Sequence, residues 1–586
     1  MVILGVSCFY HDAAAALMID GGFVAAAEEE RFSRVKHDHG FPKEAIAYCL
    51  REAGISLCDV DILAFYEKPF LKFERILFTA IDTWPRSYKT FMKAMPSWLA
   101  QKQQFAKLVR RDLGFHGRIV FGEHHLSHAA SSYLLSPFEE AAVLTVDGVG
   151  EWATTTIGRG EGSSLRLIKE IHFPHSLGLL YSTVTAHLGF RVNNDEYKVM
   201  GLAPYGSPRY ADQMRRLLEI KPDGSFALDG RYFDYTRRMR MYGRRYLETF
   251  GPPREADSEL RPEHADLAAS AQLVLEEALL GLAEAAHREV QTQNLCLAGG
   301  VALNCVANSK VPAHTPFRRM FIQPASGDSG GALGAAAFVH HLLLGRNDRR
   351  VMEHAYLGPS YEDWEIGNFL DSHGIASERL EEGELIRRTA RLLADDKVVG
   401  WFQGRMEFGP RALGSRSILA NPCNPCMKDL LNAKVKLREE FRPFAPSVLE
   451  ERASEYFDID HPSPFMLETA AVRPEARGKI PAVTHVDGSA RLQTVSRKAN
   501  PRYHALIEAF ADLSGVAVVV NTSFNIRGEP IVESPAQAYS TFKHTGIDAL
   551  VLGSYLVTDK SVAVNVKRPN IELDKDYRPA MPPVVG

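Results

Sequence analysis

The sequence of 586 residues contains no uninterrupted apolar stretch of the ~20 residues that a membrane-spanning helix needs. Its apolar runs, such as GVAVVV at 515–520, have the length of strands. Basic residues are not in excess, because 68 Lys and Arg stand against 72 Asp and Glu, a formal net charge of -4. Proteins that bind nucleic acid ordinarily present a basic face. We therefore expect neither a membrane nor a nucleic-acid partner.

Cysteine is scarce, with seven scattered residues, and this usage is typical of a reducing, cytoplasmic compartment. Cys423 and Cys426 form one CxxC, but no second Cys/His pair follows at zinc-finger spacing, so a surface loop is predicted there. The first residues, MVILGVSCFYHD, have no Lys or Arg before the apolar run. This pattern predicts a buried first strand and not a secretory signal.

The length predicts two large domains, since one hydrophobic core rarely serves so long a chain. The sequence becomes polar and charged around 344–360 (GRNDRRVMEHAYLGPS), so we place the domains at 1–350 and 351–586. The second domain has its own predicted core strands at 398–405 and 516–525. Its tail after about 565 is rich in Pro and charge and is expected to be extended.

Two segments of the first domain share one pattern of strand, turn, strand, Gly-rich turn and strand. They begin at residue 2 (VILGVSCFYHDAAAALMIDGGFVAAAE) and at residue 141 (AAVLTVDGVGEWATTTIGRGEGSSLRLIKEI). With helical sequence such as 264–290 between and after them, they predict an internal duplication. The expected fold is α/β, with two sheet-and-helix lobes that bind a nucleotide between them.

A metal site is indicated by HHLSHAASS, which places His124 and His128 four residues apart on one face of a helix. His125 points away from that face and is expected to pack or support its neighbours. Such a pair is common and also occurs without a metal, so a third ligand is needed. Asp328, in the Gly-rich segment ASGDSGGALG, is the candidate. Two imidazoles and a carboxylate would suit Fe(II), Mn(II) or a Mg-nucleotide better than a structural zinc.

Several glycine-rich turns of the first domain could face a nucleotide. Asp147 ends a strand before two glycines, although a simple hairpin turn would look the same. Asn304 stands near a helix start, where it is either a cap or a contact to a ribose hydroxyl. The candidate nucleotide contacts are Asp147, Lys198, Gly201, Gly299, Gly300 and Asn304.

A candidate general base follows the first strand. His11 titrates near neutrality, and Asp12 beside it could orient the ring, so the pair could take a proton from an alcohol. A buried, hydrogen-bonded histidine is the alternative.

The second domain places many cations among glycines and apolar residues, where a solvated face would carry Lys, Glu and Gln together. Guanidinium groups in such turns form pockets for a small, highly charged oxyanion. Exposure to solvent at the surface would also account for some of these cationic residues, most readily Lys434. The residues concerned are Arg405, Arg411, Arg416, Lys434, Lys436, Arg438, Arg442, Arg491, Asn521, Ser523, Asn525 and Arg527.

The ordered blocks of the chain together resemble the NodU/CmcH-type O-carbamoyltransferase family. The blocks are YHDAAAAL, EEERFSRVKHD, EHHLSHAASS, DGVGEW, YKVMGLAPYG, CLAGGVALNC, PASGDSGGALG, GPRALGSRSIL, REEFRPFAPSVL and NTSFNIRGEP. The resemblance covers nearly the whole chain. It implies an actin-like ATPase (ASKHA) first domain similar to the tRNA threonylcarbamoyl-transfer protein, and a second domain similar to threonylcarbamoyl-AMP synthase.

The resemblance also implies a reaction. Carbamoyl phosphate and ATP would give carbamoyl adenylate in the second domain, and the first domain would pass the carbamoyl group to a hydroxyl of a small molecule, such as a natural product. A homodimer is plausible by the same resemblance. The implied metal ligands are His124, His128 and Asp328, with Fe(II) or a similar ion; the implied base is His11; the implied carbamoyl-phosphate residues are Lys436, Arg491 and Arg527, with Arg411 and Arg416 nearby.

Four other functions fit parts of the sequence. A sugar-kinase-like phosphotransferase would use the duplicated fold, but it leaves the arginine-rich second domain unexplained. A fused tRNA-threonylcarbamoylation protein conflicts with the acidic balance, and a hydrogenase-maturation protein would carry paired CxxC zinc fingers. A nucleotide switch of the actin-like kind would have no use for carbamoyl phosphate.

Overall fold

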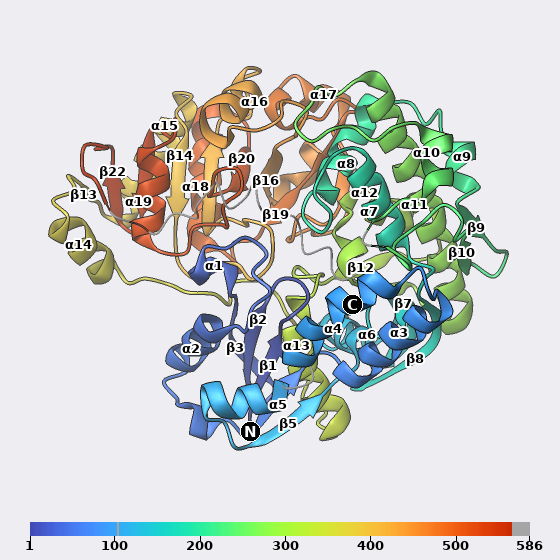
Figure 1. Ribbon diagram of the computed structural model, residues 1–586. Helices are drawn as coiled ribbons and strands as arrows, with labels where there is room; N and C mark the ends of the chain where they lie inside the picture. Colours follow the sequence, from blue (N-terminus) through green and yellow to red (C-terminus); the bar gives the residue numbers. More distant parts are fainter. Residues whose placement is uncertain (102–104, 239, 565, 567–586) are drawn as a thin grey trace. The chain divides into compact units, whose positions relative to one another are not determined.

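The computed structural model describes residues 1–101, 105–238, 240–564 and 566, and it divides into two compact units (Figure 1). Of the described residues, unit 1 contains 1–29 and 37–352, and unit 2 contains 30–36 and 353–566. The chain thus changes units two residues after the boundary expected at 350. Segment 30–36, which that boundary assigns to the first domain, belongs to unit 2. The tail expected to be extended lies outside the described residues.

Unit 1 contains two five-stranded sheets with the same topology, ordered β3-β2-β1-β4-β5 and β8-β7-β6-β11-β12. In each sheet the first three strands are antiparallel and the last two run parallel to the first. The repeated topology confirms the predicted duplication and the α/β, actin-like fold class. The strands are β1 Val2–Ser7, β2 Ala14–Ile19, β3 Gly22–Glu28, β4 Ile62–Phe65, β5 Arg118–Phe121, β6 Glu140–Val146, β7 Ala153–Glu161, β8 Ser164–His172, β11 Asn294–Ala298 and β12 Arg319–Ile322.

Two helices pack together between these sheets. Helix α6 (His124–Tyr133) packs on β6 and β11, whereas α13 (Gly330–Ala337) packs on β1, β2 and β4. Their close approach depends on Gly334, where a β-carbon would lie 1.8 Å from the carbonyl oxygen of Ser127. The sequence GGALGAAA therefore builds a helix with almost no side chains on the contact face, which brings the start of α13 next to α6.

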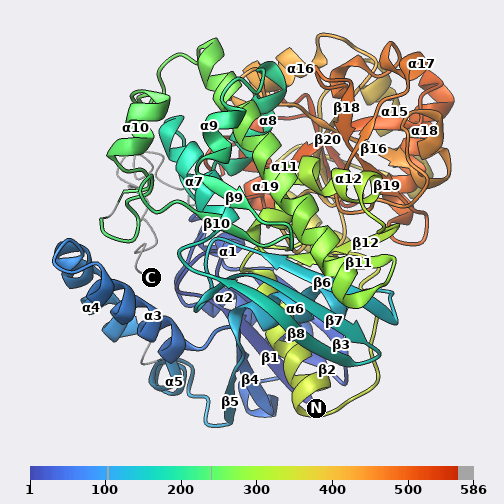
Figure 2. The ribbon, with the colours of Figure 1, turned by 90° about the vertical axis from the view of Figure 1, so that its right-hand side faces the viewer.

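The remaining helices of unit 1 lie outside the pair of sheets. Helix α11 (Pro262–Val290) packs on β6 and β7 and corresponds to the helix predicted at 264–290 (Figure 2). The others include α2 Lys43–Glu52, α3 Pro69–Asp82, α7 Leu177–His187, α8 Glu196–Leu202 and α12 Cys305–His314. Across the described residues, none of the helices has both the length and the apolar character required to cross a bilayer.

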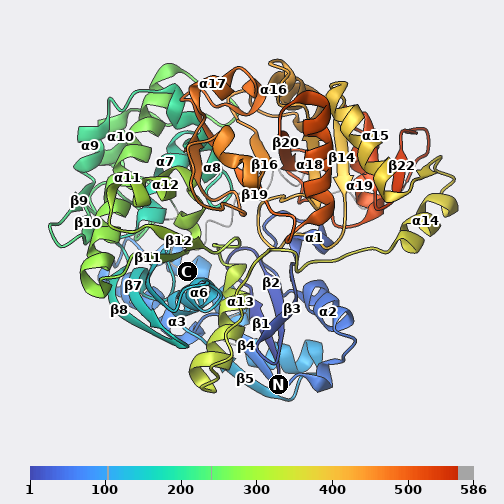
Figure 3. The same cartoon turned by 180° about the vertical axis from the view of Figure 1, so that it is seen from behind.

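Unit 2 is built on an eight-stranded mixed sheet in the order β13-β22-β21-β14-β15-β20-β16-β19. Figure 3 labels its strands β14, β16, β19, β20 and β22. Both core strands predicted for this domain are present, as β14 and β20. The strands are β13 Glu378–Arg379, β14 Val399–Phe402, β15 Arg416–Ala420, β16 Ala445–Leu449, β19 Gln493–Val495, β20 Val518–Ser523, β21 Ala549–Leu552 and β22 Tyr555–Val557. The main helices are α14 Asp363–Ser372, α15 Glu382–Ala394, α18 Pro501–Ser514 and α19 Pro535–Lys543.

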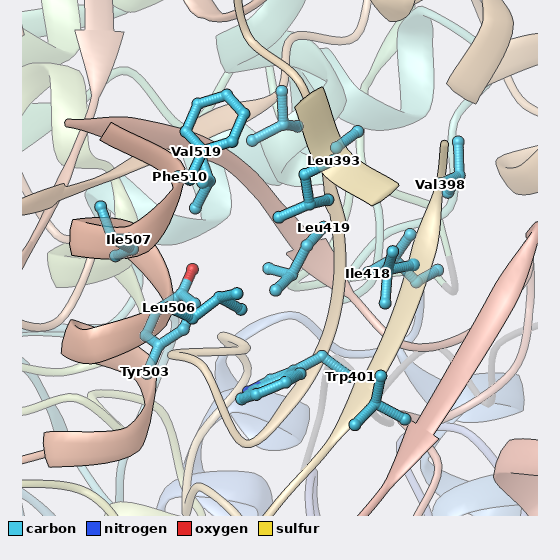
Figure 4. Packing of buried hydrophobic residues seen from close by; sticks show 14 of the residues in the cluster. Leu393, Val398, Trp401, Ile418, Leu419, Tyr503, Leu506, Ile507, Phe510 and Val519 are labelled. Atoms are coloured by element: carbon cyan, nitrogen blue, oxygen red, sulfur yellow. The ribbon is translucent and has the colours of Figure 1, made fainter. Parts of the chain in front are cut away.

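The core of unit 2 is formed by this sheet with residues of α14, α15, α18 and α19, and Figure 4 shows the part that includes α15 and α18. Trp401 of β14 is fully buried and its indole N–H donates to the carbonyl oxygen of Gly414, 3.0 Å away. Gly414 has a φ of +102°, and a β-carbon there would lie 2.2 Å from the ring of Tyr503. The loop before β15 is thus held by its glycine and by the tryptophan together.

Segment 30–36, which includes α1 (Glu30–Ser33), is held in unit 2 by buried arginines. Arg34 donates to the carbonyl oxygens of Ile531 and Pro530, at 2.7 and 2.9 Å. Arg31 donates to the carbonyl oxygen of Gly409 at 2.9 Å. A guanidinium carries five N–H donors, so it suits a buried position lined by backbone carbonyls.

Candidate functional site

The N-terminus of α6 places two histidines in the interior of unit 1. His124 and His128 are both fully buried, at 0% and 1% exposure. Glu151 holds the start of this helix, because its carboxylate accepts from the backbone N–H of His124 at 3.0 and 3.1 Å and from that of Lys68 at 2.8 Å. The predicted one-face arrangement is therefore present, and a carboxylate 27 residues away fixes it.

Four side chains converge at this point: His124, His128, Asp147 and Asp328. The Nε2 atoms of the two histidines are 3.1 Å apart, and the Nε2 of His124 is 3.0 Å from the Oδ2 of Asp147. Asp328 lies 3.8 Å from the same nitrogen and 3.7 Å from that of His128. Asp147 follows β6 and Asp328 precedes α13, so β6, α6 and the loop before α13 each contribute to the cluster.

This donor set fits a divalent cation. Ligand atoms about 2.1 Å from one ion are separated by about 3.0 Å across an octahedral edge and about 3.4 Å across a tetrahedral one. The observed separations of 3.0 to 3.8 Å lie near that range. Two imidazoles and two carboxylates also match the ligands of Mn(II), Fe(II) and similar ions.

Without a cation, protons must hold these groups together. Burial opposes protonation of His128, but hydrogen bonds to Asp147 and Asp328 raise its pKa to about 9. The same histidines, against the effect of burial, hold the pKa of Asp147 well below its usual value. Burial instead lowers the pKa of His125, whose Nδ1 contacts the hydroxyl of Thr145 at 2.7 Å. His125 thus packs beside the cluster, as expected.

Asp147 joins two features that the sequence suggested separately. Its Oδ2 faces His124, while its Oδ1 accepts from the backbone N–H of Gly300 at 2.9 Å. Gly299 has a φ of +92°, and a β-carbon there would lie 2.3 Å from the carbonyl oxygen of Val146. Asp147 was predicted as a nucleotide contact, and it lies within the four-residue cluster.

The surroundings of the cluster include open space and buried polar groups. A β-carbon at Gly327 would meet no atom within 4 Å, and one at Gly148 would meet only the hydroxyl oxygen of Tyr10, at 4.0 Å. A buried ion pair, Lys72 with Glu67 at 2.7 Å, lies beside Tyr10, since the Lys72 Nζ is 4.2 Å from the centre of the Tyr10 ring. These residues could not be predicted from the sequence, because nothing local distinguishes a buried Lys from a surface one.

The other predicted nucleotide contacts, Asn304, Lys198 and Gly201, lie on or next to helices α8 and α12. Asn304 caps α12, with its Oδ1 accepting from the N–H of Ala307 at 3.0 Å, and its amide also bonds Gln272. Lys198 lies on α8 with Gly201 and pairs with Asp195 at 3.1 Å. The capping alternative for Asn304 therefore accounts for its position, whereas Lys198 is buried but remains a candidate contact.

His11 and Asp12 form a hydrogen-bonded pair in unit 1, with the His11 Nδ1 2.7 Å from an Asp12 oxygen. A third residue, His37, binds the other Asp12 oxygen at the same distance. His37 stands in the motif EEERFSRVKHD, but nothing in that motif indicates its contact with Asp12, so it was not predicted.

In unit 2 a buried lysine stands at the end of a π-helical turn, η6 (Leu431–Lys436). Its ammonium donates to oxygens of Ser523 and Asn525, including the Asn525 Oδ1 at 2.9 Å. Burial, followed by the charges of Arg438, Arg442 and Lys36, lowers the pKa of Lys436 well below its usual value. Several cations thus gather around one buried amine, and a bound anion would relieve their repulsion.

Glu439 connects two further cations to this region. It lies 3.6 Å from Arg442 and 3.9 Å from Arg527, whose side chain is about half exposed at 51%. Lys436, Arg442 and Arg527 are therefore near one another through Glu439 and the loop after β20.

The remaining predicted pocket residues are engaged within the protein. Arg416 is fully buried and donates to the carbonyl oxygens of Gln403, Gly404, Ser415 and Pro359. Asn521 donates to Ser447, Gln493 and Ala412, which ties β20 to β16 and β19. Arg411 is in the loop before β15, and Arg491 ends a short strand, β18 (Ser489–Arg491). Arg416 and Asn521 thus stabilise the framework of the sheet.

Comparison with known proteins identifies the family. The carbamoyltransferase N-terminus family matches residues 2–337, and the carbamoyltransferase C-terminus family matches residues 390–559. The chain is 47% identical to the uncharacterized protein sll1178 of Synechocystis sp., over 98% of each chain. It is 39% identical to the nodulation protein NolNO of Sinorhizobium fredii, over 95% of this chain and 80% of that one.

A further relative has a named activity. The 3'-hydroxymethylcephem-O-carbamoyltransferase of Amycolatopsis lactamdurans is 34% identical, over 76% of this chain and 81% of that one. The two family matches include residues of both units, and the relatives named here agree with them. The chain belongs to the carbamoyltransferase family and is a carbamoyltransferase enzyme.

Proposed function

We propose that the enzyme consumes ATP and carbamoyl phosphate and transfers the carbamoyl group to a hydroxyl of a small molecule. The observation that carries the proposal is the convergence of His124, His128, Asp147 and Asp328 in unit 1, a donor set for a divalent cation. The cationic region around Lys436 in unit 2 would bind the anionic substrates. Residues 1–350 would then act in transfer and 351–586 in activation. Seven free cysteines agree with a cytoplasmic enzyme.

In unit 2, carbamoyl phosphate would be split by water into carbamate and phosphate. A carbamate oxygen would then attack the α-phosphorus of ATP, giving carbamoyl adenylate and pyrophosphate. Both substrates are polyanions, and the buried Lys436 with Arg438 and Arg442 offers the positive charge that binds them. Activation is needed because carbamate is a poor electrophile, whereas AMP is a good leaving group.

In unit 1, the hydroxyl oxygen of the acceptor would attack the carbamoyl carbon, AMP would leave, and the hydroxyl proton would pass to a base. His11 is the proposed base, on the strength of the resemblance and its partnership with Asp12. A divalent ion held by the four-residue cluster would polarise the carbonyl and offset phosphate charge. The glycines at 148 and 327 leave room beside the cluster for the adenylate.

The acceptor is a hydroxylated small molecule, by analogy with the relative named for hydroxymethylcephem carbamoylation. A natural product, such as an antibiotic or a glycoside, is the proposed class.

Product analysis tests the proposal. The full chain is incubated with ATP and carbamoyl phosphate in the presence of Fe(II), Mn(II) or Mg(II), and nucleotides are separated by chromatography. AMP and pyrophosphate that require carbamoyl phosphate are the expected products. ADP would indicate a kinase and overturn the proposal, as would nucleotide turnover that ignores carbamoyl phosphate. A panel of hydroxyl compounds then reports transfer by the mass of one added carbamoyl group.

A further inference from the structure

We infer that His37 and Asn194 are positioning residues that act on His11 through the carboxylate they help to hold, that of Asp12. The inference deepens the proposed function, because it concerns the base of the transfer step. His37 and Asn194 come from two motifs, VKHD and NNDEYK, to which the sequence analysis gave no such role.

The four residues form one continuous chain of hydrogen bonds in unit 1. Asn194 Oδ1 is 2.6 Å from the Nε2 of His37, and the Nδ1 of His37 is 2.7 Å from Asp12 Oδ1. The other Asp12 oxygen is 2.7 Å from the Nδ1 of His11, and the Nε2 of His11 is 2.5 Å from the carbonyl oxygen of Asn193. The two rings lie 4.7 Å apart, centre to centre.

The backbone around this chain is held in a costly conformation. Asp12, His37 and Asn193 have φ values of +43°, +56° and +63°, and Phe9 has +71°. This left-handed region is unfavourable for residues with a side chain, least so for Asp and Asn, and such a residue persists where its surroundings impose it. Two backbone hydrogen bonds, Phe9 N–H to His39 O and Ala13 N–H to Asp38 O, both 2.7 Å, hold the loops together. Strain of this kind collects at functional sites.

The partners decide where the protons are. Asn194 donates from its nitrogen to Asp195 at 3.1 Å, so its oxygen faces His37, and the Nε2 of His37 must be a donor. For His11, a carboxylate faces one ring nitrogen and a backbone carbonyl faces the other, and neither can donate. Both His11 nitrogens therefore carry protons in this conformation.

The chain also fixes which nitrogen is the base. When His11 loses one proton, the Asp12 carboxylate retains the proton on Nδ1, which leaves the lone pair on Nε2. That nitrogen must leave the carbonyl of Asn193 before it can accept the proton of a hydroxyl group. Against the effect of burial, Asp12 raises the pKa of His11 to about 10, with Asp328 contributing; Glu196 is a further neighbouring acid. His37 is a second donor to the Asp12 carboxylate, so it weakens the interaction of that carboxylate with His11. The pKa of His11 is therefore lower than it would be without His37.

This arrangement predicts opposite effects from its two ends. If the donor at residue 37 is removed, Asp12 binds only His11, and the pKa of His11 should rise. If the charge of Asp12 is removed, the pKa of His11 should fall. Loosening of the loops without such a network would lower the pKa in both cases, since His11 would lose its partner. The three side chains could also hold a metal ion, but their ring nitrogens are already engaged with oxygen.

The test follows His11 by NMR in the full chain with ring-¹⁵N-labelled histidine, its signal assigned by its loss in His11→Gln. We expect His37→Phe to raise the His11 titration by about one pH unit, tenfold in proton affinity, and Asp12→Asn to lower it by at least as much. His37→Asn keeps a donor near the Nδ1 position and should shift it less. The matched control is His39→Phe, an exposed residue of the same loop, which should change nothing.

Two outcomes would overturn the inference: a His11 titration that does not move in His37→Phe, or one that falls as it does in Asp12→Asn. His37→Gly, which also removes the donor and suits the positive φ of residue 37, provides the answer if the phenylalanine variant fails to fold. The NMR result does not depend on an acceptor or on carbamoyl phosphate, so it stands apart from the product analysis above. With an acceptor in hand, His37→Phe should lower kcat for transfer about tenfold at pH 8, leave KM unchanged and recover at higher pH.

Discussion

The four side chains of the metal-compatible cluster have conflicting requirements when no cation is present. Two carboxylates and two imidazoles meet in a buried site, and the Nδ1 atoms of His124 and His128 find no hydrogen-bond partner among the described residues. Protons on Nε2 partly resolve the conflict, as the raised pKa of His128 indicates. A divalent ion would replace those protons and could bind both Nε2 atoms and both carboxylates at once.

The first prediction concerns His128. His128→Gln should lower the affinity for Mn(II) or Fe(II) at least tenfold, because it removes one of four converging donors. Metal content per chain, measured by plasma mass spectrometry after reconstitution and desalting, reports the loss. His172→Gln is the matched control, since His172 is half exposed and pairs with Glu170 at the surface. Equal metal content in the two variants would contradict the assignment.

The second prediction concerns Lys436. Lys436→Met should weaken the binding of carbamoyl phosphate by about 10- to 100-fold, since a buried charge-assisted contact contributes about 1.5–3 kcal/mol. Isothermal titration calorimetry on the full chain measures the change. Lys434→Met is the control on the same turn, because Lys434 is exposed. If both variants bind equally well, the pocket lies elsewhere.

At the scale of elements, the contact between α6 and α13 sets the geometry of the cluster. Gly334→Ala would place a methyl group 1.8 Å from the Ser127 carbonyl oxygen, so α6 must move. We expect a loss of about 3 kcal/mol in the free energy of unfolding, together with weaker metal binding, because Ser127 lies between the two histidines. Denaturant titration and metal content are the measurements.

The control for that substitution is Gly383→Ala in α15. Its new methyl group would meet only the flexible end of Arg387, at 3.3 Å. Its stability should change by less than about 1 kcal/mol. If Gly334→Ala behaves in the same way, the tight helix contact does not determine the site.

Segment 30–36 provides the next prediction. Arg34→Met leaves two buried carbonyl groups, those of Pro530 and Ile531, without their donor. We expect unit 2 to lose about 2–3 kcal/mol of stability and residues 529–532 to exchange amide hydrogens faster, as measured by mass spectrometry. Arg387→Met, which removes an exposed arginine of the same unit, should leave both quantities unchanged. Unchanged exchange in Arg34→Met would mean that the segment is not anchored there.

Elements defined by local signals could be predicted from the sequence. The repeated strand-turn-strand pattern follows from apolar runs and turns such as the one at Gly21, whose φ is +76°. This pattern was enough to predict the internal duplication. The spacing of His124 and His128 placed both rings on one helix face. What could not be predicted depends on tertiary register: Asp147 meets these histidines through the sheet, and His37 meets Asp12 through loop pairing. Nor could Arg34 be distinguished from a surface arginine, since its partners are distant backbone carbonyls.

At the scale of the whole molecule, the two units differ in the charge they gather. Unit 1 concentrates carboxylates and imidazoles, which are ligands for a cation, around the start of α6. Unit 2 concentrates ammonium and guanidinium groups around Lys436, which attract anions. A chain with a net charge of only -4 thus contains two clusters of opposite character, and overall charge could not reveal either of them.

This division predicts that the two half-reactions can be lost separately. Lys436→Met should abolish the formation of AMP and pyrophosphate from ATP and carbamoyl phosphate, and transfer with it, because no activated carbamoyl group is made. His128→Gln should still form AMP and pyrophosphate but lose transfer to any acceptor that the wild type carbamoylates. Both products are measured in one reaction mixture: AMP by chromatography and the carbamoylated acceptor by mass spectrometry. Loss of AMP formation in His128→Gln would mean that activation also depends on unit 1, and the assignment of one step to each unit would have to be abandoned.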